Sequence, residues 1–332
     1  MEPNHRGRNF LSLLFRVGLS GALLIYLFRK MDTASLKEAL QNANFVYLAA
    51  GAVVFFVIHG ILLVRWLLFV HALKLDVPLG SLVRYFFVGL FFNLFLPSST
   101  GGDLIKALGV CQYTPHKAKV VASVVLDRLS GFVAIVLVAF VSFVVGYRWI
   151  RDVSLLFSIA ILGVLVAVIL TVLFNERLFS FGCRVFSRFP KVKNSLMNLH
   201  YTIAFFKDSP SAIRGAIFAS CISQILLALT FFLIAKALHQ NIPMVYFFIF
   251  VPMICVVASL PSIGGLGVRD AGAAHLFAKV GVASSIAVGI TLINFAFMVA
   301  VGLLGGLVYV AHLSPRWVQH HPSDTAMGKE TY

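Results

Sequence analysis

Charged residues interrupt apolar stretches of this sequence at three places, and there they could form a binding site for an anion. The residues are Asp103, Lys106, Asp127, Arg128, Arg269 and Asp270. An ionisable side chain within an apolar segment is costly unless it faces a partner or a wet cavity, so such residues are candidates for function. Arginine can grip a phosphate or carboxylate through two parallel hydrogen bonds. We therefore expect Arg128 and Arg269 to hold an anionic group, with Asp127 and Asp270 orienting or releasing them.

Two of these charged groups follow a break in an apolar segment. Leu-Pro-Ser followed by Gly-Gly occurs at 96–102 and again at 260–265. Proline removes a backbone donor and paired glycines favour non-helical backbone, so the apolar segments 85–96 and 243–260 should unwind at these points. A helix that restarts there presents free N–H groups, which suit an anion. The residues predicted to permit the broken backbone are Pro97, Gly101, Gly102, Pro261, Gly264, Gly265 and Gly267.

The same charged residues allow a second interpretation. Asp127, Arg128, Asp103 and Arg269 could neutralise one another as interhelical ion pairs that lock a helical bundle. Both interpretations can hold together, because a buried ion pair can be the resting state of a site that opens to an anionic ligand. The sequence leaves this choice open.

The composition predicts that these charged residues lie in the helices of a membrane protein. Of 332 residues, 60% are hydrophobic and 12% are charged, about half the charged fraction of a soluble domain. The formal net charge of +15 is interpreted as a topology signal and an attraction to anionic lipid, because no nucleic-acid-binding module is present. Six stretches are long enough to cross the bilayer as helices: 10–28, 45–64, 120–146, 153–174, 213–235 and 284–311.

The predicted fold is an all-α polytopic membrane protein with six full crossings and two broken re-entrant hairpins. If the N-terminus is cytoplasmic, the loops 65–84, 104–119 and 175–214 are cytoplasmic too, and 17 basic residues lie inside against 8 outside, as the positive-inside rule expects. The two similar hairpins would then enter from opposite faces, which is typical of an inverted repeat with a binding site near the midplane. Ordinary surface turns between short helices are the alternative.

No sequence motif indicates catalysis. The chain contains no nucleophile elbow, no paired histidines with a carboxylate, no phosphate-binding glycine loop after a strand and no Cys-His pairing. We therefore predict no metal and no cofactor, and favour a protein that is not an enzyme. A membrane enzyme that works with few acidic residues stays open.

Taken together, the motifs resemble those of the lysylphosphatidylglycerol synthase transmembrane family, also called flippase-like domain proteins. The resemblance covers most of the chain, with Asp127 standing where many relatives have glutamate. The segments that carry it are Leu96-Pro97, Gly101-Gly102-Asp103, Asp127-Arg128, Leu260-Pro261-Ser262, Gly264-Gly265-Leu266-Gly267 and Arg269-Asp270. It implies a short cytoplasmic N-terminus (1–9), a flippase-like transmembrane domain (10–311) and a polar, disordered tail (312–332) that is too short for the synthase domain.

The resemblance implies a stand-alone protein of the plasma or inner membrane that moves an anionic phospholipid or a polyprenyl-phosphate-linked lipid between leaflets. Its partners would be membrane lipids and, through a basic cytoplasmic loop, a lipid-synthesis enzyme. The alternative is a membrane enzyme of lipid aminoacylation, glycosylation or polyprenyl-phosphate metabolism, with Asp103 or Asp127 as general base, or an accessory subunit of such an enzyme. The sequence does not indicate an oligomeric state.

Overall fold

The fold is seen in a computed structural model, which describes most of the chain. The described residues are 33–95, 101–146, 153–183, 197–198, 200–203, 209–258 and 267–313. The predicted first span (10–28), the residues Pro97, Pro261, Gly264 and Gly265, and the tail from 314 onward lie outside them. Within the described residues the structure is helical throughout and contains no strand, so the all-α prediction is confirmed.

Five helices of the described chain are long and apolar enough to cross a membrane. These helices are α3 (Phe45–Ala72), α6 (Lys117–Gly146), α7 (Val153–Phe174), α10 (Pro210–Ala237) and α13 (Ser284–Leu313). Each contains one of the predicted spans. The shorter helices are α2 (Thr33–Gln41), α4 (Leu79–Phe95), α5 (Gly101–Val110), α8 (Glu176–Cys183), α11 (Met244–Ala258) and α12 (Val268–Ala278).

The two segments that the sequence marks as broken form pairs of short helices. In the first half α4 and α5 contact each other, and in the second half α11 and α12 do. Gly101 and Gly102 lie in the first turn of α5 rather than in an unwound segment. Gly267 immediately precedes α12 with a φ of 81°, which an L residue with a side chain rarely adopts.

The order long, short, short, long occurs twice along the chain. Helices α3, α4, α5 and α6 have 28, 17, 10 and 30 residues, and α10, α11, α12 and α13 have 28, 15, 11 and 30. The ends of α3 and α10 also match, because each is followed by leucine and then by a residue with positive φ, Lys74 (50°) or His239 (58°).

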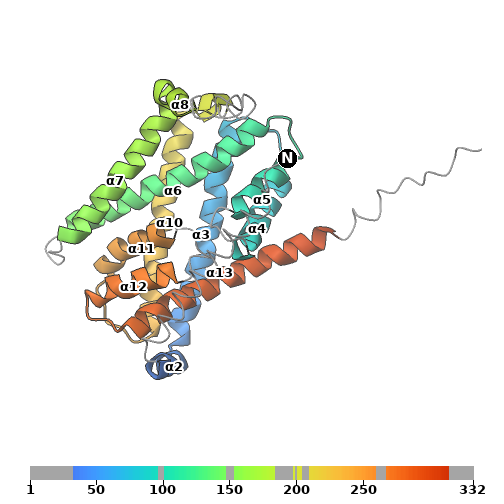
Figure 1. The fold of residues 1–332 in the computed structure, drawn as a ribbon. Helices are drawn as coiled ribbons and strands as arrows, with labels where there is room; N and C mark the ends of the chain where they lie inside the picture. Colours follow the sequence, from blue (N-terminus) through green and yellow to red (C-terminus); the bar gives the residue numbers. More distant parts are fainter. Residues whose placement is uncertain are drawn as a thin grey trace, which may run out of the picture.

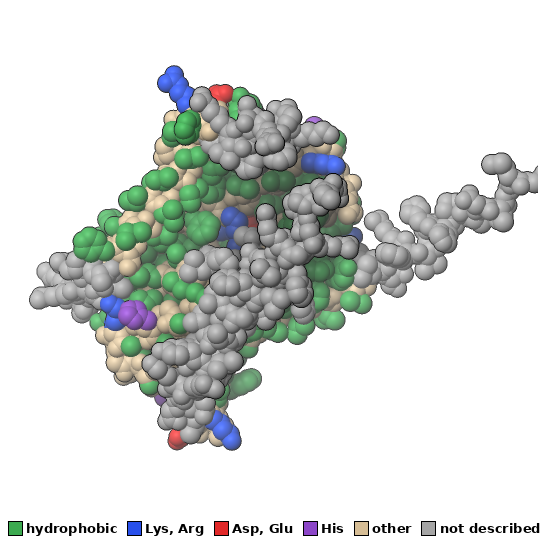
Figure 2. All heavy atoms as spheres, in the orientation of Figure 1, with side chains coloured by type: hydrophobic (Ala, Val, Ile, Leu, Met, Phe, Trp, Pro, Cys, Tyr) green, Lys and Arg blue, Asp and Glu red, His purple; other side chains and the backbone are tan. Residues whose placement is uncertain are grey.

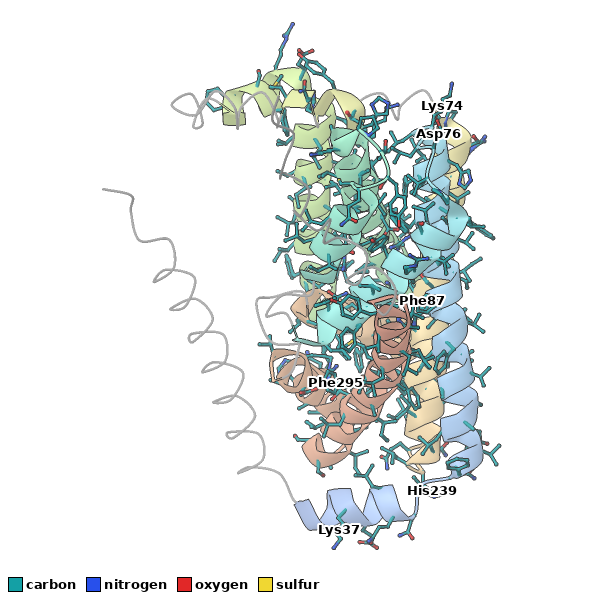
Figure 3. All side chains as sticks on the ribbon, turned by 90° about the vertical axis from the view of Figure 1, so that its right-hand side faces the viewer. Lys37, Lys74, Asp76, Phe87, His239 and Phe295 are labelled. Atoms are coloured by element: carbon teal, nitrogen blue, oxygen red, sulfur yellow. The ribbon has the colours of Figure 1, made fainter. Side chains whose placement is uncertain are left out.

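The two matching long helices run antiparallel, side by side (Figures 1 and 3). The backbone N–H of Asn44, before α3, donates to the carbonyl of Ala237 at the end of α10 over 2.9 Å. Lys74, after α3, lies at one end of the molecule and His239, after α10, lies at the other (Figure 3). The first half therefore runs in the opposite direction to the second along this axis.

The two largest hydrophobic clusters of the described residues are each centred on one half. In the first half, Trp66 and Phe69 of α3 pack with residues of α4, α5 and the start of α6. In the second half, Phe247, Phe250 and Phe277 pack between α10, α11, α12 and α13. The halves also exchange contacts, since α4 packs on α13 and α11 packs on α6.

Glycines on α13 allow α4 to approach closely. A Cβ atom at Gly302 would lie 2.5 Å from a carbon of Leu94, and one at Gly306 would lie 2.7 Å from the ring of Phe91. A Cβ at Gly305 would overlap the backbone carbonyl of Phe87. Backbone cannot move aside as a flexible side chain can, so this contact depends on a small residue.

Candidate functional site

A buried ion pair joins the C-terminal half of α3 to the N-terminal half of α6. The Nε of Arg65 donates to Oδ1 of Asp127 over 2.7 Å, and the side chains are only 9% and 6% exposed. Arg65 also donates from Nη1 to Oγ of Ser220 on α10, at 3.1 Å. Charges in so apolar a setting need a partner and further hydrogen bonds to offset the cost of leaving water. The pair therefore fixes three long helices around one charged centre.

Lys106 on α5 points into the same centre. Its Nζ lies 3.3 Å from Oδ1 of Asp103 and 3.6 Å from Oδ2 of Asp127. It also lies 4.5 Å from the centroid of the Trp66 ring, a cation–π contact. The indole N–H of Trp66 donates to Oγ of Ser123 on α6 over 3.2 Å, so a hydrogen bond to α6 orients the ring that covers the lysine.

The second carboxylate of this centre, Asp103, also binds Arg128. The Nε of Arg128 donates to Oδ2 of Asp103, so Asp103 is shared between an arginine and a lysine. The side chain of Arg128 is 39% exposed, whereas those of Arg65 and Lys106 are almost fully buried. Arg128 is thus the cation of this cluster that a molecule outside the protein reaches first.

In the second half, Asp270 holds Arg269. The Nε and Nη2 of Arg269 donate to Oδ1 of Asp270 over 3.1 and 2.9 Å, and Oδ2 of Asp270 accepts from the backbone N–H of Gly267 over 2.9 Å. The guanidinium carbon also lies 5.5 Å from the centroid of the Phe295 ring. Both oxygens of Asp270 are therefore engaged, one by Arg269 and the other by the backbone of Gly267.

These charged side chains surround one cavity of about 300 Å³ between the two halves. At about 30 Å³ per water this is room for roughly ten waters, enough for a lipid headgroup but not for acyl chains. Figure 2 shows basic and acidic side chains at the centre of an otherwise hydrophobic face. The polar lining residues are Arg65, Asn93, Asp103, Lys106, Asp127, Arg128, Arg269 and Asn294.

The charges around the cavity do not balance. Four basic side chains, Arg65, Lys106, Arg128 and Arg269, accompany three carboxylates, Asp103, Asp127 and Asp270. The described site therefore carries one excess positive charge in an apolar body. Such a site favours a bound monoanion, because the low local dielectric strengthens the attraction.

The structure brings five of the six predicted site residues together at this cavity. Asp270 lies behind it, bound to Arg269. One predicted pairing differs, because Asp103 binds Arg128 while Asp127 binds Arg65 and Lys106. The backbone N–H groups that follow the two breaks were expected to be free to bind an anion. One of them, the N–H of Gly102, instead donates to Oδ1 of Asn93 over 2.8 Å.

The prediction from sequence missed Arg65. It placed this residue in a cytoplasmic loop that begins at 65, but α3 continues to Ala72 and Arg65 is 7% exposed. The apolar residues 66–70 that follow it were the available signal. Arg65, Lys106 and Arg269 are buried and should not be counted as loop residues. Without them, the loops predicted to be cytoplasmic still contain more basic residues than the loops predicted to lie outside.

Asn93 and Asn294 also line the cavity. His59 does not line the cavity; its Nδ1 donates to the carbonyl of Phe55 in the same helix over 2.9 Å. Among the described residues, no group of three or more His, Cys, Asp or Glu side chains gathers in a way that could hold a metal ion.

Comparison with known proteins gives two matches. The family model described as "Lysylphosphatidylglycerol synthase TM region" matches residues 13–306. A protein named "UPF0104 membrane protein" from Methanothermobacter thermautotrophicus is 24% identical over 327 residues, which cover 90% of this chain and 94% of that protein. No solved structure matches significantly.

Proposed function

The chain belongs to the lysylphosphatidylglycerol synthase transmembrane family, and on that premise we propose that this multi-pass membrane protein moves an anionic lipid between leaflets. The lipid is a phospholipid or a polyprenyl-phosphate-linked lipid, and its phosphate enters the cavity while its chains stay outside. The observation that carries the proposal is the partly exposed Arg128 at a cavity with one excess positive charge.

The roles of the charged residues follow from their contacts. The phosphate of the lipid competes with Asp103 for Arg128, because both are anions that suit the same guanidinium. Arg269, held by Asp270, is the arginine that the second half contributes to the cavity. Asp127 keeps Arg65 and Lys106 in place and limits the positive charge to a level that lets the lipid leave again.

We further propose that the two halves are an inverted repeat. Movement of one half relative to the other would then carry the lipid across the membrane. Three observations support this: the matching helix lengths, the antiparallel α3 and α10, and the exchanged packing of α4 on α13 and α11 on α6. In inverted repeats, broken helices meet near the midplane, and rocking of one repeat against the other opens the site to alternate sides.

The proposed orientation places the N-terminus in the cytoplasm and the protein in the plasma or inner membrane. The connection after α3 and helix α8, both assigned to the cytoplasm, lie at one end, while α2 and His239 lie at the other (Figures 1 and 3). This segregation agrees with the excess of basic residues in the loops assigned to the cytoplasm.

Two alternatives remain. In an enzyme of lipid modification, Asp103 or Asp127 would act as general base, but each carboxylate is bound to two cations and is poorly placed to take a proton. In an accessory subunit, the basic loop 175–214 would dock a lipid-synthesis enzyme. Copurification of such an enzyme that is lost when the basic residues of this loop are neutralised would favour the second alternative.

The test of the proposal is lipid movement in proteoliposomes. A fluorescent phosphatidylglycerol or polyprenyl phosphate is followed by chemical quenching of the outer leaflet, for the wild type, Arg128→Gln and Arg177→Gln. Arg177 lies exposed on α8, away from the cavity, and serves as the matched loss of one arginine. We expect rapid movement for the wild type and for Arg177→Gln, and slow movement for Arg128→Gln. No movement by the wild type, or equal movement in all three, contradicts the proposal.

A further inference from the structure

Asn294 on α13 presents an unsatisfied amide at the cavity. The residue is 9% exposed, it lines the cavity, and its Oδ1 has no hydrogen-bond partner among the described residues. Its neighbour Thr291, one turn earlier on the same helix, is fully buried and donates to the carbonyl of Val288 over 2.8 Å. Two other buried side chains of the described residues, His200 and Gln224, also have an atom without a partner, but neither lines the cavity, so Asn294 is the one of the three that a ligand there could reach.

The position of Asn294 corresponds to that of Asp127 in the other half. Asn294 is the eleventh of the 30 residues of α13, and Asp127 is the eleventh of the 30 residues of α6. In the first half this position carries a charge that binds two cations, whereas in the second it carries a neutral amide. At this position α6 therefore presents a charge to the cavity, and α13 presents an uncharged polar group.

An unsatisfied buried amide destabilises a folded protein, and leucine of similar size would fit an apolar helix interface better. A ligand that enters the cavity could supply the missing hydrogen-bond partner, and this would explain why a buried amide stands at this position. The side chain offers both an acceptor oxygen and N–H donors. A hydroxyl group has the same dual character, so it is the natural complement of this side chain.

The other acceptors around the cavity are already occupied. Both carboxylates that line it, Asp103 and Asp127, are held by cations, and Oδ1 of Asn93 accepts from Gly102 N–H. The basic side chains are donors without an acceptor. Among the described side chains that line the cavity, Oδ1 of Asn294 is the buried oxygen that no donor occupies.

We propose that Asn294 binds a hydroxyl group on the headgroup while the arginines bind its phosphate, so that the site selects phosphodiester lipids with hydroxylated headgroups. This inference rests on the proposed function and narrows its substrate class. A phosphodiester carries one negative charge, which matches the single excess positive charge of the site when Asp270, bound to Arg269 behind the cavity, is counted with the lining residues. A phosphodiester with a plain alkyl headgroup would neutralise the arginines equally well but leave Asn294 unpaired.

The experiment compares two lipids of equal charge. Fluorescent phosphatidylglycerol carries hydroxyl groups on its headgroup, and phosphatidylethanol with the same acyl chains carries an ethyl group instead. Movement of each is measured in proteoliposomes for the wild type, Asn294→Leu and the control Thr291→Val. Thr291→Val removes a polar group from the same helix that is satisfied within it and is absent from the cavity lining.

We expect the wild type to move phosphatidylglycerol faster than phosphatidylethanol. Asn294→Leu should slow phosphatidylglycerol about tenfold, as for one lost hydrogen bond, and change phosphatidylethanol less than about twofold. Thr291→Val should preserve the preference of the wild type. Equal rates for both lipids in the wild type, or equal slowing of both by Asn294→Leu, overturns the inference.

Binding separates a failure of this inference from a failure of the proposed function. If the wild type moves neither lipid, the translocation proposal fails, and the role of Asn294 is decided by thermal stabilisation of the detergent-solubilised protein with dihexanoyl forms of both lipids. A larger shift with phosphatidylglycerol that is lost in Asn294→Leu supports the selection of hydroxyl groups. Shifts that are equal for the two lipids, or the same in the wild type and Asn294→Leu, refute it.

Discussion

Arg65 and Asp127, separated by 62 positions in the sequence, form a direct hydrogen-bonded ion pair of 2.7 Å at the centre of the helical bundle. Helix α3 contains no acidic residue, so the carboxylate that balances Arg65 comes from another helix. The pair links α3 to α6, and Lys106 and Ser220 extend it to α5 and α10. The charged cavity is built around this link.

Breaking this ion pair on one side should destabilise the protein more than removing both partners. Asp127→Leu leaves Arg65 buried without its carboxylate and should cost about 3–5 kcal/mol, whereas Arg65→Leu with Asp127→Leu should cost less, because Lys106 keeps Asp103. Unfolding in mixed micelles, followed by tryptophan fluorescence, measures the double-mutant cycle. Strictly additive effects of the two substitutions would refute the coupling.

Removing the charge of Asp103 should strengthen the binding of an anionic lipid. Asp103 binds Arg128, so Asp103→Asn removes a carboxylate that competes with phosphate for this guanidinium and should tighten binding by about tenfold. Tighter binding also makes release slower, so transport should not rise in parallel. The measurement is the affinity for dihexanoyl phosphatidylglycerol, with Arg177→Gln as the control. Weaker binding by Asp103→Asn would mean that the carboxylate supports the phosphate site instead.

The packing of α4 on α13 should tolerate no side chain at Gly305. Gly305→Ala places a Cβ against the carbonyl of Phe87 and should lower the stability by about 1–3 kcal/mol. Gly60→Ala on α3 is the matched control, because nothing lies within 4 Å of its Cβ; it should raise the stability by roughly 0.5–1 kcal/mol. Thermal unfolding measures the change in stability of each variant relative to the wild type. A change of the same sign in both variants would be evidence against this contact.

Asn294→Leu should make the protein more stable while making it a poorer transporter. Replacing an unsatisfied buried amide by an apolar side chain should gain roughly 1–2 kcal/mol of stability. Thr291→Val, which removes a hydroxyl that is satisfied within the helix, should not gain as much. The unfolding temperatures of both variants are compared with that of the wild type without lipid. A loss of stability in Asn294→Leu would show that the amide has a structural partner.

The apolar stretches of the sequence determined the fold class and the approximate helix positions. Every described long helix contains a predicted span, because about 20 apolar residues in a row have few stable forms other than a membrane helix. The charged residues at the breaks were also identified from type and setting alone. Asp103, Lys106, Asp127, Arg128 and Arg269 stand out since charge in an apolar segment is costly.

Which charges meet was decided by the tertiary structure. The pairs Arg65 with Asp127 and Arg128 with Asp103 depend on how α3, α5 and α6 cross, and hydropathy along the chain carries no information on helix rotation. The sequence prediction assigned Arg65 to a loop, because a charged residue at the end of an apolar stretch looks like the end of a membrane helix as long as its buried partner is unknown. The empty partner position of Asn294 is likewise a property of the packed bundle. The sequence therefore determined that charges are buried, because a charged residue inside an apolar segment can be recognised from its neighbours in the chain. Only the packing of the helices determined which partners neutralise those charges.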